Sequence, residues 1–320
     1  MYHVAFLAVT AHRRQMGEWT MLGNLPEGSG IAANYPGDKG IEKDSAVVFA
    51  DDFETTPAGR LPDGYRKGDE KKWDGSTRCL VTDQAANVHS GTRSLEMTIA
   101  RPGPQPAGCG VQKNFEEGFD TLFLRYYAKF DKDNDLYHGG AHNGGTIDAR
   151  PPGLPLASPG VRANGGNVYT AVLDSFRSEE QIRSPGHLVV YCYHMDQGGR
   201  WGDQFYASGK VLPPGRGPEV FGKEFVPRPD FIPEQGVYHC FELMVHANTP
   251  GKRDGRIAFW VDGHVRGDFP NLRLRNVPTL RANHVTLGIY THNPRVQRNA
   301  SIWFDDVVMA TSYIGPQAPS

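Results

Sequence analysis

Two short stretches near opposite ends of this 320-residue chain each combine strand-forming residues with a pair of acids. One is VVFADDFE at 47–54, and the other is IWFDDVVMAT at 302–311. β-Branched and aromatic residues without a helical period predict strands. Two matching strands at the two ends of the chain predict an all-β fold: an antiparallel β-sandwich in which the first and last strands are neighbours.

Further strand patterns fill the chain between these two stretches, and no long amphipathic helix is predicted. The 38 glycines and 24 prolines agree with many strands joined by turns. We predict one β-sandwich domain over 44–315, an irregular N-terminal arm at 1–43 and a short tail at 316–320. The arm is expected to pack along the outside of the sandwich or to mediate self-association with another subunit. Strands are predicted at 46–53, 94–99, 121–130, 168–173, 187–194, 238–247, 256–261, 284–292 and 301–310.

Charge and hydropathy exclude two classes of partner. The formal net charge is −2 and the basic residues are spread along the chain, so no nucleic-acid surface is predicted. No apolar run is long enough to span a membrane. The apolar run at 4–9 is short and is followed, not preceded, by arginines, so it does not read as a secretory signal.

The four cysteines do not have metal-binding spacing. Cys79 and Cys109 lie in loop-like surroundings and could form a disulfide. Cys192 and Cys240 fall within predicted strands, where buried free thiols are the simpler interpretation.

Alternation along the strands predicts which side chains share a face. In the strand at 121–130, Leu122 and Leu124 share the core face, while alternate polar residues point the other way. Neighbouring strands show the same division, which is typical of a concave glycan-binding sheet. Three long loops, at 137–166, 196–235 and 271–283, are candidates for functional segments. The polar face is predicted to carry Arg125, Tyr127, Tyr191, Tyr193, His246, Tyr290 and His292, with His138 and His142 on a loop that forms one wall.

Seven motifs occur in an order that resembles a known family. They are DDFE at 51–54, SGTRSL at 90–95, LRYYAKF at 124–130, YCYH at 191–194, NTPG at 248–251, WVDG at 260–263 and WFDD at 303–306. This order is similar to that of the concanavalin A-like jelly-roll proteins close to alginate and glucuronan lyases. The resemblance covers roughly 46–315 and implies a jelly-roll fold with a polysaccharide-binding groove. It also implies an extracellular or periplasmic location.

The resemblance further implies β-elimination next to a uronic acid. In such lyases a cationic or polar side chain neutralises the uronate, and a tyrosine, or a tyrosine and a histidine, removes and returns a proton. Tyr191 and Tyr193 match the paired tyrosines of the lyases. The chain departs from the family at Thr170-Ala171-Val172, where a Ser-x-Arg pair is usual, and at His142, where a lysine often occurs. Neutralisation is therefore expected from His142 with Arg125, or from Arg150.

The acids of the two end strands are candidate ligands for a hard cation. Calcium takes carboxylate and carbonyl oxygens, and jelly-roll proteins that this chain resembles often carry a structural calcium between their first and last strands. The expected ligands are Glu54, Asp305 and Asp306, and the alternative is that these acids are exposed at strand ends. His138 and His142 are four residues apart but lack the helical zinc motif, so groove-lining histidines are favoured over zinc ligands.

Three functions remain open from the sequence. The first is a secreted lyase-like protein acting on uronic-acid glycans, and the second is a non-catalytic carbohydrate-binding module. The third is a structural or assembly protein that uses the jelly roll as a scaffold. Trp201, in a long loop, could stack on a sugar ring or hold its loop against the sheet.

Overall fold

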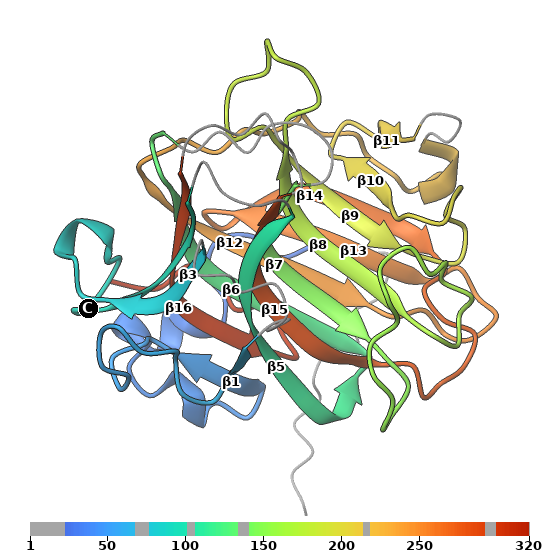
Figure 1. The fold of residues 1–320 in the computed structure, drawn as a ribbon. Coiled ribbons are helices and arrows are strands. Elements are labelled where there is room, and N and C mark those ends of the chain that lie inside the picture. The colour runs from blue at the N-terminus through green and yellow to red at the C-terminus, as the bar shows by residue number, and fades with distance from the viewer. Residues whose placement is uncertain are drawn as a thin grey trace, which may run out of the picture.

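Two antiparallel β-sheets packed face to face make up the computed structural model of this chain (Figure 1). The structure describes residues 23–67, 77–100, 106–133, 141–213, 218–291 and 299–319. Within these residues the helical turns are all short 3-10 turns, and no α-helix occurs. The all-β jelly-roll sandwich expected from the sequence is confirmed.

The first sheet, called sheet A, contains eight strands. In spatial order they are β14 (His264–Leu272), β13 (Gly255–Val261), β12 (Tyr238–His246), β6 (Thr121–Phe130), β16 (Ala300–Ala310), β4 (Ser94–Ile99) and β3 (Thr77–Thr82), with β1 (Val47–Asp51) paired to the end of β16.

The second sheet, called sheet B, also contains eight strands and lies nearer the viewer in Figure 1. In spatial order they are β11 (Val211–Leu212), β10 (Asp203–Tyr206), β9 (His187–Tyr193), β8 (Tyr169–Phe176), β7 (Ala141–Ala149), β15 (Ala282–Thr291), β5 (Ala107–Phe119) and β2 (Arg66–Lys67). The 3-10 turns are η1 (Ile31–Asn34), η2 (Pro36–Asp38), η3 (Ile41–Lys43), η5 (Ala85–Asn87) and η6 (Pro218–Phe221).

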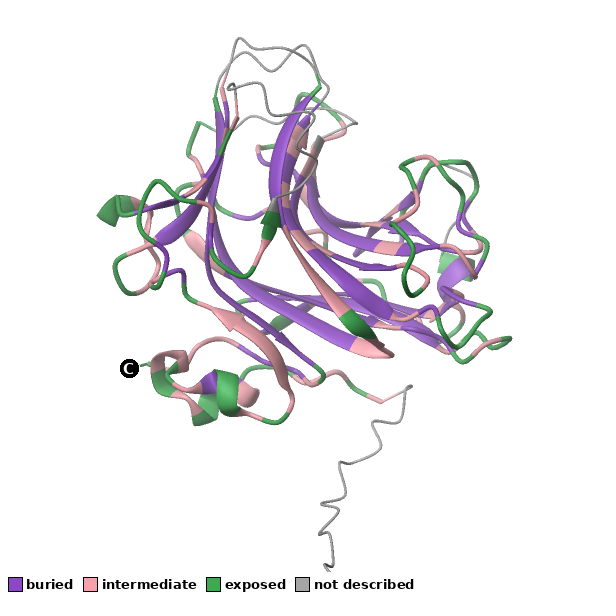
Figure 2. Cartoon of the chain, turned by 60° about the horizontal axis from the view of Figure 1, so that its bottom comes forward, coloured by how far each residue is buried: buried purple, intermediate pink, exposed green. Residues whose placement is uncertain are grey.

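The first and last strands of the sandwich are neighbours, as predicted. Strand β1 pairs antiparallel with β16, with Phe49 opposite Met309 and Asp51 opposite Val307. The core between the sheets also follows the predicted alternation: Leu124, Leu243 and Val190 are fully buried. Figure 2 shows buried residues along both curved sheets.

Strand β7 corrects one prediction, because the sequence indicates a loop throughout 137–166. Its glycines resemble turn residues but are required inside the sheet. A Cβ atom on Gly145 would lie 2.5 Å from Cε1 of Tyr126, which packs across from sheet A. His142 is therefore fixed on a strand in the middle of sheet B rather than on a loop.

The described part of the N-terminal arm packs along the outer face of sheet A, which was one of its two expected positions. Trp260 donates from Nε1 to the carbonyl of Pro26 (2.7 Å), and the backbone N–H of Val265 donates to Glu27 (2.7 Å). Apolar residues of the arm, with Tyr313 and Ile314 near the C-terminus and side chains of sheet A, form a second, smaller core on this face. The arm therefore covers sheet A and leaves the outer face of sheet B as the other broad face of the sandwich.

The four cysteines are free thiols, so the disulfide left open for Cys79 and Cys109 is not formed, and their expected loop-like surroundings are wrong. Both residues lie in strands, β3 of sheet A and β5 of sheet B, and Cys109 donates from Sγ to the carbonyl of Arg78 (3.1 Å). Among the described residues, no helix is long and apolar enough to cross a membrane.

Candidate functional site

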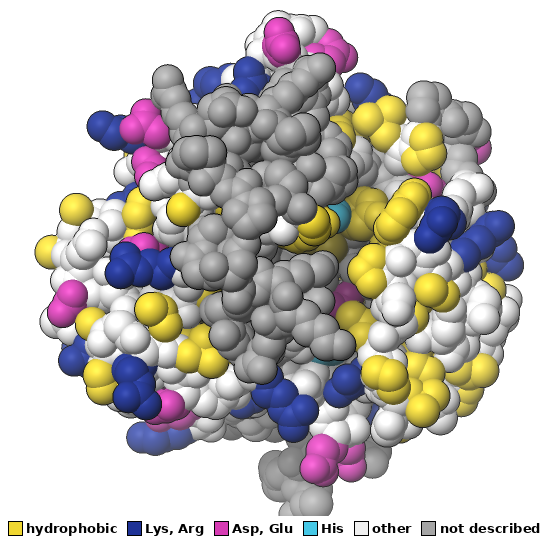
Figure 3. All heavy atoms as spheres, in the orientation of Figure 1, with side chains coloured by type: hydrophobic (Ala, Val, Ile, Leu, Met, Phe, Trp, Pro, Cys, Tyr) yellow, Lys and Arg dark blue, Asp and Glu magenta, His cyan; other side chains and the backbone are white. Residues whose placement is uncertain are grey.

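Three tyrosines and a histidine form a row across the outer face of sheet B. Tyr290 of β15 is paired in register with His142 of β7, and their rings are 6.0 Å apart and nearly parallel. The ring of Tyr191, on β9, lies 5.0 Å from His142 on the other side, and Tyr193 follows two residues later. We call these four residues the tyrosine–histidine row. Figure 3 shows this face hollowed near its centre, with histidine and acidic side chains visible there.

The buried carboxylate of Asp174, on β8, bonds to the histidine of the row. Its Oδ2 lies 2.7 Å from Nδ1 of His142, and its Oδ1 accepts the backbone N–H of Asn143 (2.8 Å). Asp174 is buried, whereas the His142 side chain is 39% exposed. Burial alone would lower the pKa of His142, but the Asp174 carboxylate outweighs it and raises that pKa above its usual value.

The two tyrosines of β9 are linked by their hydroxyl groups. Tyr191 accepts a hydrogen bond from the backbone N–H of Gly202 (3.1 Å) and donates to Tyr193 (3.3 Å). Tyr193 also accepts from the backbone N–H of Gly160 (2.9 Å). Burial, with the hydrogen bond to Tyr193 second, raises the pKa of Tyr191 far above its usual value. Tyr193 accepts both bonds, so within the described residues its own hydroxyl proton has no acceptor.

Two loops bring these backbone donors to the row, and Trp201 lies where they meet. A Cβ atom on Gly160 would be 3.0 Å from the Trp201 ring, so the loops touch here. The guanidinium of Arg200 lies 5.0 Å from the centre of that ring. Trp201 is nevertheless 52% exposed. It therefore both holds the loops together and presents aromatic surface beside Tyr193.

The structure does not bring all the predicted site residues to one face. Arg125, Tyr127 and His246 are on β6 and β12 of sheet A, so the prediction that they line the groove with Tyr191 is wrong. Alternation places a residue on one face of its own strand but does not say which of two sheets that strand joins. His138 and His292 lie outside the described residues.

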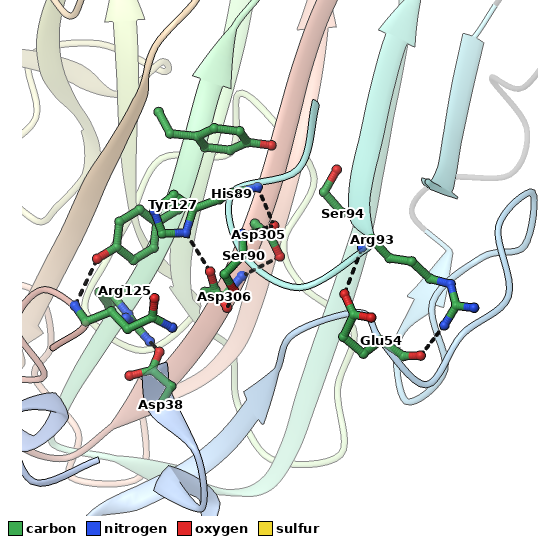
Figure 4. Close-up of polar contacts among 12 residues, drawn as sticks. Asp38, Glu54, His89, Ser90, Arg93, Ser94, Arg125, Tyr127, Asp305 and Asp306 are labelled. Carbon is green, nitrogen blue, oxygen red and sulfur yellow. Dashed lines mark hydrogen bonds and ion pairs between the residues drawn. The ribbon is translucent and has the colours of Figure 1, made fainter. Parts of the chain in front are cut away.

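Arg125 and Tyr127 instead help to fasten the chain termini, and His246 bonds to Thr121 of β6 (2.7 Å). Arg125 is fully buried and is ion-paired with Asp38 of the arm. The Tyr127 hydroxyl accepts the backbone N–H of Gln317 from the tail (2.9 Å), and its ring stacks on that of His89. Figure 4 shows this cluster on the outer side of sheet A.

The acids expected to bind calcium anchor one loop between β3 and β4. Asp305 accepts the backbone N–H of His89 (2.9 Å), and Asp306 bonds to Ser90 Oγ (2.9 Å) and to His89 Nδ1 (2.7 Å). Glu54 accepts the backbone N–H of Arg93 (2.7 Å) on the same loop (Figure 4). No group of three metal-binding side chains is found within the described residues. Calcium would therefore need backbone carbonyl oxygens as well as these acids.

The calcium site remains a prediction with a thermal test. Burial, and then the neighbouring Asp306, raises the pKa of Asp305, so a bound cation would offset the cost of its charge. If calcium binds, the melting temperature should be higher in millimolar calcium than in EDTA. A ligand at a hundredfold excess over its Kd adds about 2.7 kcal/mol. Glu54→Gln should lose this response and Asp52→Asn should keep it. Identical melting curves in both buffers would exclude the site.

Comparison with known proteins supports the fold. No family model and no curated protein matches the chain. Among solved structures, a double mutant of alginate lyase Aly36B in complex with an alginate tetrasaccharide is 15% identical, with a TM-score of 0.55, covering 85% of this chain and 98% of that one. Unmutated Aly36B is 18% identical, with a TM-score of 0.52, covering 82% and 96%. An endo-β-1,4-glucuronan lyase from the fungus Trichoderma reesei is 16% identical, with a TM-score of 0.48, covering 83% and 95%.

Proposed function

We propose that this chain is a polysaccharide lyase that cleaves uronic-acid glycans by β-elimination at the tyrosine–histidine row. The observation that carries the proposal is the partly exposed His142, held by Asp174, beside two linked tyrosine hydroxyls on the outer side of sheet B. The fold shared with Aly36B, which binds an alginate tetrasaccharide as a double mutant, supports the same substrate class. A uronic-acid polysaccharide would be met outside the cell, so the proposal implies export.

The reaction needs one proton acceptor and one proton donor. His142 Nε2 removes the C5 proton of the uronate. The electron pair of that C–H bond forms the C4–C5 double bond as the C4–O glycosidic bond breaks. The Tyr193 hydroxyl protonates the departing oxygen. His142 is then protonated and Tyr193 is a phenolate. Transfer of the proton from His142 to Tyr193, directly or through water, restores both groups.

The environments of the two groups favour this division of roles. Asp174 raises the pKa of the exposed His142, which suits a base near neutral pH, while Tyr191 stays protonated because burial raises its pKa. Tyr191 can therefore keep donating to Tyr193, which favours Tyr193 as the acid. The roles differ from those expected from the sequence, in which a tyrosine was the base and His142 the neutraliser.

Tyr193→Phe tests the acid role. The substitution removes the hydroxyl and keeps the ring, so the elimination rate on a uronate polymer should fall by about a hundred- to ten-thousandfold with affinity nearly unchanged. The unsaturated product absorbs in the ultraviolet, which gives the rate directly. Tyr238→Phe, on sheet A, removes a hydroxyl bonded to the Asn87 carbonyl and is the matched control. Equal rates for Tyr193→Phe and wild type would contradict the acid role.

A second candidate is a carbohydrate-binding module that uses the same face without catalysis. The position of Arg125 favours it, because the cation expected to neutralise the uronate lies on the other sheet. This candidate predicts that wild-type protein binds uronate polymers and never forms unsaturated ends. A protein that neither binds nor cleaves any of a panel of glycans would instead fit the scaffold interpretation.

A further inference from the structure

We infer that Asp174 is a positioning residue that fixes the His142 imidazole with Nε2 toward the open side of the row. The inference rests on the proposed function and names a residue that the sequence patterns did not single out. Asp174 is buried and does not reach substrate, so it acts through His142.

Both carboxylate oxygens of Asp174 are engaged by consecutive residues of β7. Oδ2 meets His142 Nδ1 at 2.7 Å, and Oδ1 accepts the Asn143 N–H at 2.8 Å. The next pair along the two strands is also linked: the Asn143 amide oxygen accepts from the backbone N–H (3.0 Å) and Oγ (2.8 Å) of Ser175. Two adjacent side-chain links thus join β7 to β8, and the Asp174 carboxylate cannot turn without losing a bond.

This arrangement selects one form of the neutral imidazole. A carboxylate accepts hydrogen bonds but does not donate them, so Nδ1 of His142 carries the proton and Nε2 carries the lone pair. The groups facing His142 are Asp174 from β8, Tyr191 from β9 and Tyr290 from β15. Tyr126 packs across from sheet A, and its hydroxyl accepts the Gly145 N–H (3.0 Å). Nε2 is therefore the nitrogen available to a ligand.

Two other histidine–aspartate pairs in or next to sheet B differ from His142 and Asp174 in how far the histidine is accessible. His284 bonds to Asp148 through Nδ1 and to Gln112 through Nε2, so both of its ring nitrogens are used inside the sheet. His194 bonds to Asp203 but is fully buried in the sandwich. His142 alone of these three is substantially exposed, at 39% of its side chain. Its aspartate therefore serves a histidine that solvent and ligands can reach.

Asp174→Asn tests the inference by two independent readouts. NMR of the imidazole nitrogens, with His142 assigned by its loss in His142→Gln, should show a lower pKa and a loss of the single tautomer. Elimination kinetics should show a kcat about a hundredfold lower, with KM little changed and the acid limb of the pH profile moved to lower pH. Asp203→Asn removes another buried carboxylate paired with histidine and should leave the His142 titration and the pH profile unchanged.

The outcomes separate this inference from the proposed function. An unchanged His142 titration in Asp174→Asn would overturn the inference, and so would a changed titration with an unchanged rate. If wild type eliminates no polymer, the proposed function fails while the NMR result still shows whether Asp174 positions His142. If Asp174→Asn does not fold, wild-type NMR decides. A single tautomer with the lone pair on Nε2 and a raised pKa is expected, and an ordinary pKa or the opposite tautomer would overturn the inference.

Discussion

His142→Gln should lower the elimination rate on a uronate polymer by about a hundred- to ten-thousandfold, the usual contribution of a positioned base. Glutamine retains an N–H that can donate to Asp174, so the buried carboxylate keeps a partner and the melting temperature should stay close to that of wild type. The rate is measured from the ultraviolet absorbance of the unsaturated product. His246→Gln replaces a histidine on sheet A, bonded to Thr121, and should leave the rate unchanged.

The pH dependence of kcat/KM fixes the role of His142. A base acts in its neutral form, so the rate should fall as the pH drops through the pKa of His142. Because Asp174 raises that pKa, the fall should begin at a higher pH than for an ordinary histidine. A rate that instead falls as the pH rises through this range would mean that the imidazolium is required, and His142 would then be a neutraliser of the uronate.

Arg125→Met should lower the free energy of unfolding by about 3–5 kcal/mol, the usual cost of removing one partner of a buried ion pair. Arg125 is fully buried beneath the N-terminal arm, and its loss leaves the carboxylate of Asp38 without its cation. Urea unfolding followed by circular dichroism measures the change. The matched control is the double variant with Asp38→Asn, which removes both charges and should recover most of the loss. A single variant as stable as wild type would show that the pair does not hold the arm.

Loosening of the arm has a second expected consequence. The face under the arm is apolar and includes Phe123, Met244 and Trp260. Large exposed apolar patches promote association. Arg125→Met should therefore also show more self-association by size-exclusion chromatography than wild type.

Local patterns were sufficient to predict the closure of the sandwich and the identity of its core. The acid-bearing strands at the two ends are neighbours, and alternation correctly placed Leu124, Val190 and Leu243 inside. The core assignment depends on residues close together in the chain, whereas the pairing of the end strands was predicted from two similar patterns far apart in it. The period of two is a property of each strand alone.

The assignment of strands to sheets could not be predicted in this way. Arg125 and Tyr191 both alternate with core residues, but they occupy opposite outer faces because β6 and β9 belong to different sheets. Strand β7 was not predicted because its glycines resemble turn residues. Gly145 is required there because Tyr126 of the other sheet packs too close for a side chain. Asp174, one residue beyond the strand predicted at 168–173, was not singled out from the sequence, and the pairing of β7 with β8 places it against His142. The missing information in each case was a contact distant in sequence.

Mass spectrometry of the products from a uronate polymer incubated with wild-type protein tests the central claim most directly. Elimination releases fragments whose new non-reducing ends are unsaturated and one water lighter than those made by hydrolysis. We predict these lighter ends with wild type, and their near absence with His142→Gln and Tyr193→Phe. Fragments that carry the full water, or a polymer that stays intact across alginate, glucuronan and related substrates, would contradict an elimination site on sheet B.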